Sequence, residues 1–116
     1  MTSLSEDLSF AVSYFSTIGL SAKAINRAFN DIKSKSTITV EDLGDFQRLA
    51  NDLPYVGDRD YGALLLEQEA CRRFGEQKKL LLDSALERAD YCAYTSTSGG
   101  EGLSRSSHVT RIKNLA

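Results

Sequence analysis

The chain has 116 residues, of which 41% are apolar and 26% are charged, a composition typical of one small globular domain rather than of a disordered protein. Its formal net charge of −2 gives it no general electrostatic attraction to nucleic acid or to anionic lipid. No apolar run approaches the roughly 18 residues that a membrane span requires, and no Lys or Arg precedes Lys23, as a secretory signal would require. We therefore expect a cytoplasmic protein.

The first two helices are expected at residues 3–18 and 21–32. Ser3 and Glu6 form a capping-box sequence, in which each side chain accepts a backbone N–H of the first turn. Gly19 can end the first helix, because glycine readily adopts the backbone conformation that follows a helix. Apolar residues recur at helical spacing on both sides of this glycine: Leu8, Ala11, Val12, Phe15 and Ile18 before it, and Ile25, Ala28, Phe29 and Ile32 after it.

The turn at Gly19 resembles a helix-turn-helix DNA-binding motif, in which a glycine takes a positive φ angle between two helices that pack on each other. The second helix would then expose Lys23, Asn26 and Arg27, residue types that hydrogen-bond to base edges. Two features oppose this hypothesis. Phe15 is large for a position where the helices approach closely, and the net charge is negative. We therefore keep a DNA-binding regulator that dimerises through its last helix as the alternative function.

A third helix is expected between Thr39, which can cap it, and Pro54, which stops it. Residues 37–49 also resemble the second half of an EF-hand calcium site. In that register, however, Lys33 and Lys35 would occupy the third and fifth loop positions, where calcium needs oxygen ligands. The sequence therefore predicts no calcium site, and it contains no pattern that predicts another metal or a cofactor.

The last and longest helix is expected over residues 62–94. It would extend roughly 50 Å at ~1.5 Å per residue, whereas a compact domain of this size has a radius of gyration of only ~12–13 Å. The helix must therefore overhang the other three helices or kink back at Gly75. We favour the overhang and expect another chain to cover its apolar stripe. The residues predicted at this interface are Leu66, Phe74, Leu81 and Ala85.

The segment that follows is rich in small polar residues. Ten of the thirteen residues from 95 to 107 are Ser, Thr or Gly, and such a segment buries too little surface to offset the entropy of ordering it. We expect a flexible tail over residues 95–116, within which the alternating residues 108–112 would suit a short docked strand. The predicted fold is all-α, with three short helices and one long C-terminal helix in a domain at residues 1–94.

Catalysis finds little support in the sequence. His108, the only histidine, falls in the predicted tail, so no preorganised pair of nucleophile and base can be placed. We therefore predict a non-enzymatic α-helical interaction module that self-associates or binds a protein partner through its last helix.

Overall fold

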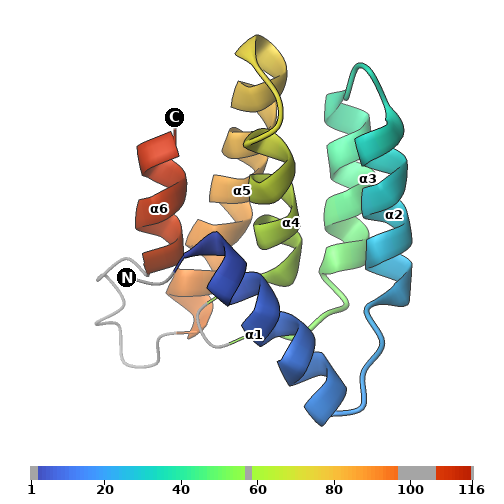
Figure 1. The fold of residues 1–116 in the computed structure, drawn as a ribbon, viewed down its shortest axis with the longest axis vertical. Helices are drawn as coiled ribbons and strands as arrows, with labels where there is room; N and C mark the ends of the chain where they lie inside the picture. The colour runs from blue at the N-terminus through green and yellow to red at the C-terminus, as the bar shows by residue number, and fades with distance from the viewer. Residues whose placement is uncertain (1–2, 57–58, 97–106, 116) are drawn as a thin grey trace.

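The structure, a computed structural model, describes residues 3–56, 59–96 and 107–115, and this part of the chain contains six α-helices and no β-sheet (Figure 1). The predicted all-α class is confirmed. The predicted number and lengths of the helices are wrong, because α5 is the longest helix and the last one is short. No helix in the described part is both long and apolar enough to cross a membrane. The helices are α1 (Leu4–Thr17), α2 (Lys23–Ser34), α3 (Val40–Ala50), α4 (Tyr61–Ala70), α5 (Gly75–Ser96) and α6 (Ser107–Leu115).

Helices α1 and α3 begin at capping residues that the sequence identifies. The Ser3 hydroxyl accepts the backbone N–H of Glu6 at 3.1 Å, and the Thr39 hydroxyl accepts that of Asp42 at 3.2 Å. The Asp42 carboxylate in turn accepts the Thr39 N–H at 3.0 Å, and this hydrogen bond lowers the pKa of Asp42. Gly19 has a φ angle of 75° just after α1, in the left-handed region that favours glycine. Local sequence therefore determines these helix ends.

The predicted helix over residues 62–94 is instead two helices, α4 and α5, which lie side by side and run in opposite directions (Figure 1). The chain turns at residues 71–74, and Gly75 has a φ angle of 61°. The 22 residues of α5 extend about 33 Å, less than the 41 Å of the molecule's longest dimension. The kink at Gly75 is therefore the correct alternative, and α5 does not overhang the fold.

Helix α4 lies at the centre of the fold, in contact with α1, α2, α3 and α5. Nine of its ten residues are buried, which explains why its sequence lacks a continuous polar stripe. Leu66 on α4, and Leu81 and Ala85 on α5, are each 0% exposed. These three predicted interface residues lie in the chain's own core, so the length argument that assigned them to a partner fails. Phe74, the fourth, lies in the turn and is 86% exposed.

Residues 107–115 form helix α6 rather than a flexible tail or a strand. The helix packs against α5, and its apolar residues Val109 and Ile112 are 0% and 1% exposed. This docking corrects the prediction for the end of the chain, where the polar residues suggested a solvated segment. The part of the predicted tail at residues 97–106 lies outside the described residues.

Candidate interaction groove

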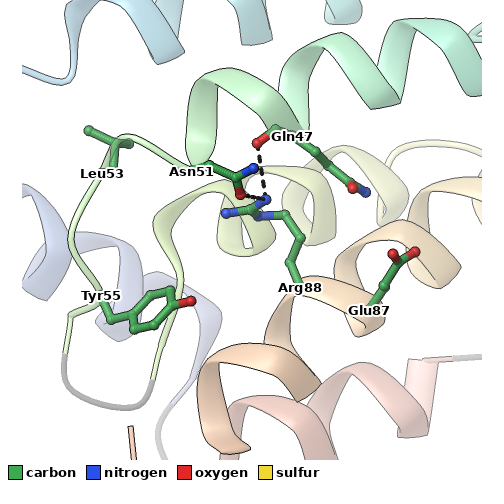
Figure 2. A pocket seen from close by; sticks show the side chains of 6 residues that line it. All are labelled: Gln47, Asn51, Leu53, Tyr55, Glu87 and Arg88. Atoms are coloured by element: carbon green, nitrogen blue, oxygen red, sulfur yellow. Dashed lines mark hydrogen bonds between the residues drawn. The ribbon is translucent and has the colours of Figure 1, made fainter. Parts of the chain in front are cut away.

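A groove follows the seam between α3 and α5. It consists of two adjoining hollows that share Gln47 and Glu87, one of about 460 Å³ near the end of α3 (Figure 2) and one of about 200 Å³ near its start. The groove forms because α3 packs mainly on α2 and α5 packs mainly on α4, so α3 and α5 make few direct contacts. We refer to this feature as the α3–α5 groove.

Arg88 of α5 links the helices at one end of the groove. Its guanidinium donates two hydrogen bonds to the Asp60 carboxylate, at 2.8 and 2.9 Å. It also donates to the Gln47 carbonyl at 3.1 Å and to Asn51 Oδ1 at 3.0 Å (Figure 2). Asp60 also caps α4, because its carboxylate accepts the N–H of Ala63 at 2.9 Å. The Arg88 side chain is only 10% exposed. It therefore acts as a structural link and has little donor capacity left for a ligand.

Gly62 provides the space for this link. A Cβ atom at residue 62 would lie 2.9 Å from Ala50 Cβ, 3.0 Å from Asp60 Oδ1 and 3.4 Å from Arg88 Nε. The first two distances are shorter than ordinary van der Waals contacts. Glycine at this position therefore allows α4 to approach α3 closely beside the Asp60–Arg88 pair.

The opposite end of the groove is fixed by a second set of polar contacts. The Ile38 N–H donates to Gln77 Oε1 at 2.6 Å, and Gln77 Nε2 donates to the Ile38 carbonyl at 3.0 Å. Arg73 adds hydrogen bonds to backbone carbonyls of residues 33–36 at distances from 2.6 to 3.3 Å. The chain between α2 and α3 is therefore held against the turn between α4 and α5.

Two large apolar side chains stand in solvent beside this fixed junction. Val40, the first residue of α3, lines the groove together with Leu80 of α5, and it is 69% exposed. Phe74, in the turn before α5, is 86% exposed. Leu53 and Tyr55 supply apolar surface at the other end of the groove, on the side opposite Glu87 (Figure 2). The groove thus has apolar surface at both ends and polar side chains between them.

The exposed charges that line the groove are carboxylates. Asp83 and Glu87 are exposed and lie one turn apart on α5. Asp83 contacts Lys79 at 3.1 Å, but both side chains are more than 60% exposed, so this pair is weak. Glu87 makes no ion pair with the described part of the chain. Because Asp60 neutralises Arg88, the lining has a net negative charge.

A second charged cluster lies where α1, α4 and α6 meet, and we call it the sealed ion cluster: Asp7, Arg59, Glu67 and Arg111. Arg111 donates to Asp7 at 2.6 Å and to the two oxygens of Glu67 at 2.6 and 2.9 Å. Arg59 donates to the other oxygen of Asp7 at 2.7 Å. Both carboxylate side chains are 0% exposed. Solvent does not reach these carboxylates, so the cluster fastens α6 to α1 and α4 and does not form a ligand site.

His108 borders the sealed ion cluster from α6. Its Nε2 atom lies 3.4 Å from Glu67 Oε1, within ion-pair distance, but neither ring nitrogen has a hydrogen bond of good geometry with the described residues. Burial alone would raise the pKa of Glu67. The hydrogen bonds from Arg111 and the proximity of His108 outweigh burial and hold that pKa below its ordinary value. The histidine that the sequence places in a tail is thus a buried neighbour of this cluster.

The residues predicted for DNA binding lie on α2. Lys23, Asn26 and Arg27 are all exposed, and the Asn26 side chain accepts a hydrogen bond from the Tyr61 hydroxyl at 2.7 Å. Burial of Tyr61 raises its pKa and keeps its hydroxyl protonated. Helix α1 packs mainly on α4, and α2 packs mainly on α3, so the two helices do not form the closely packed pair of a helix-turn-helix motif. DNA binding stays a prediction, but this geometry does not favour it.

The groove residues have no shared signal in the sequence. Arg88 lies 28 residues from Asp60 and 41 from Gln47, so no local motif links them. No group of three or more His, Cys, Asp or Glu side chains is arranged to hold a metal within the described ranges. The EF-hand register fails structurally as well, because Asp31 lies inside α2 and no loop begins there. Comparisons of the chain with the profiles of known protein families, with curated proteins and with solved structures find no match.

Proposed function

We propose that the protein is a cytoplasmic, non-enzymatic interaction module that binds a protein partner in the α3–α5 groove. The observation that carries this proposal is the 69% exposure of Val40 in the lining of a groove that has further apolar surface at both ends, from Leu80, Leu53 and Tyr55. Burial of one such side chain contributes about 1.5–3 kcal/mol. Apolar contacts at both ends of the groove would supply a large share of the ~8 kcal/mol that corresponds to a micromolar complex.

The chemistry of the lining supports binding rather than catalysis. The side chains of Gln47 and Ser84 are hydrogen-bonded to each other, and the donors of Arg88 are engaged by its neighbours. Glu87 is an exposed carboxylate, but the described lining residues offer no nucleophile and general base within hydrogen-bond distance of each other. Apolar anchors surrounded by polar groups are typical of protein interfaces.

Two valine variants test the proposal. Val40→Ser removes the groove valine, and Val12→Ser is the matched control, because Val12 is a 55% exposed helical valine on α1. We expect both variants to unfold within about 0.5 kcal/mol of the wild type, as exposed substitutions do. Each variant is then cross-linked to its partners in a cell extract, and the amount of captured partner is measured by quantitative mass spectrometry. We expect this amount to be unchanged for Val12→Ser and about tenfold lower for Val40→Ser.

Sedimentation of the same variants separates a second copy of the chain from a different partner. A wild-type dimer that Val40→Ser dissociates would identify the partner as a second copy. Equal capture by both variants would exclude the groove as the binding surface.

A further inference from the structure

We propose that the partner segment is an amphipathic helix of another protein, with Lys or Arg beside its apolar residues. This inference rests on the proposed function and names the partner that the α3–α5 groove fits. It is carried by the length of the groove, by the distribution of apolar surface along it, and by its charge.

The walls of the groove are helices, and their length sets the length of the segment that fits between them. The 11 residues of α3 extend about 16 Å, which is three turns of an α-helix at ~5.4 Å per turn. Val40 and Leu80 lie at one end, and Leu53 and Tyr55 lie at the other. A helix with apolar residues at its first and fourth turns reaches both ends, which is the usual arrangement when a helix binds in a groove.

The negative charge of the groove lining favours a basic partner helix. Asp83 and Glu87 are four residues apart on α5, so their carboxylates lie one above the other along the groove wall. Cations that are also three or four residues apart on a partner helix would face both carboxylates. An acidic helix would meet like charges, which disfavours it.

Neither α1 nor α2 of a second copy of the chain offers such a helix. Helix α2 exposes Lys23 and Arg27, but its apolar residues Ile25, Phe29 and Ile32 are all buried in its own core. Helix α1 exposes Phe10 and Val12, but it carries no Lys or Arg. Helix α3 exposes Leu49 and Arg48, but it is itself a wall of the groove, so we assign the bound segment to another protein.

The test selects helical peptides from a display library against the full chain and measures the affinities of synthetic versions by fluorescence anisotropy. We expect selected peptides with apolar residues at helical spacing and a net positive charge. The Glu87→Lys variant should bind these peptides about tenfold more weakly at low salt, because it loses a facing charge pair. Asp31→Lys, which reverses an exposed acid on α2, is the matched control and should change affinity less than twofold. Peptides with Glu in place of their Lys residues should then bind Glu87→Lys better than the wild type.

The other outcomes are distinguishable. Peptides that require Val40 but are neutral or acidic, or that bind Glu87→Lys as well as the wild type, would overturn the basic-helix proposal and leave the groove as a binding site. Selection without any enriched peptide, or enriched peptides that are insensitive to Val40→Ser, would overturn both proposals. A chain that dimerises through the groove would also overturn the basic-helix proposal, because the occupant would then be a second copy.

Discussion

Two arginines hold the central helix α4 in the same chemical way but in contrasting surroundings. Arg111 of α6 binds Glu67 within α4, and Arg88 of α5 binds Asp60 at the start of α4, each through two hydrogen bonds. Their side chains are similarly buried, at 13% and 10% exposure. Beyond Arg111 the space is filled by α1 and the second carboxylate, Asp7, whereas Arg88 lines an open hollow of about 460 Å³.

The contrast shows that helix spacing, rather than side-chain chemistry, distinguishes the structural cluster from the candidate binding site. Breaking a buried arginine–carboxylate pair destabilises the contact between helices, because removal of either partner leaves a desolvated charge. The α3–α5 groove is open because α3 and α5 each pack on a different neighbour. A ligand can therefore approach Glu87 at the rim, while the sealed ion cluster stays inaccessible.

The largest difference in the free energy of unfolding is expected between Arg111→Ala and Arg88→Ala. Arg111→Ala leaves Glu67 buried without its main partner, and we expect a loss of about 3–5 kcal/mol in the free energy of unfolding. Arg88→Ala leaves Asp60 with its capping hydrogen bond to Ala63 and next to a water-accessible hollow, so we expect a smaller loss of about 1–3 kcal/mol. Urea unfolding followed by circular dichroism measures both values.

Arg72→Ala is the control for these truncations, because the Arg72 side chain is 63% exposed and lies 3.4 Å from Glu69. Its cost should stay within about 0.5 kcal/mol. If Arg88→Ala cost as much as Arg111→Ala, the distinction between a sealed cluster and an open groove would be wrong.

Acid should weaken the sealed ion cluster specifically. The pKa of Glu67 is lowered in the folded state from an ordinary value of 4.5, despite burial, by its contacts with Arg111 and His108. The ionised carboxylate therefore stabilises the fold above about pH 4.5, and this contribution is lost as the pH falls below that value through the lowered pKa. Asp7 and Arg59 are hydrogen-bonded within the same cluster.

The measurement compares the wild type with Glu67→Gln by urea unfolding between about pH 7 and about pH 3. We expect the variant to be less stable at neutral pH and the difference to shrink in acid, because protonation makes the wild-type side chain neutral as well. A difference that stays constant over this range would show that folding does not lower the pKa of Glu67.

The sequence predicts local features of this fold better than distant ones. The caps at Ser3 and Thr39 and the turn at Gly19 depend on residues within four positions, and the structure has all three. The break before α5 is less visible, because the apolar pattern continues on both sides of it and only Gly75 marks the turn. Arg73 stabilises that turn through carbonyls 37 to 40 residues away, which no local pattern reports.

Helix α6 shows that the residues of the sealed ion cluster are also hard to predict, because their contacts join distant parts of the sequence. The local sequence suggests that Arg111 is a solvated residue in a polar tail. Its side chain is instead only 13% exposed, because it pairs with Glu67 and Asp7. These partners lie 44 and 104 residues away, so no local pattern predicts the contact. The groove depends in the same way on how α3 and α5 pack on their neighbours, so Val40 and Glu87 look like ordinary residues of helix surfaces. Phe74 is the one predicted interface residue that the fold leaves exposed.

The last two substitutions are at glycines on either side of the groove floor, and they are expected to have opposite effects. Gly62→Ala would place a Cβ atom 2.9 Å from Ala50 Cβ, and separating α3 from α4 should cost about 1–3 kcal/mol. Gly44, inside α3 on the groove wall, has no atom within 4 Å of an added Cβ. Gly44→Ala should therefore increase stability by up to about 1 kcal/mol, because alanine has the higher helix propensity.

The two substitutions separately change the packed contact between α3 and α4 and the open wall of the groove. Thermal unfolding should move in opposite directions for the two variants, while the added methyl group of Gly44→Ala narrows the groove and weakens peptide binding. If Gly44→Ala destabilised the protein as much as Gly62→Ala, the wall of the groove would have to be packed against another part of the chain. The α3–α5 seam would then resemble the sealed ion cluster, and it would no longer be a candidate binding surface.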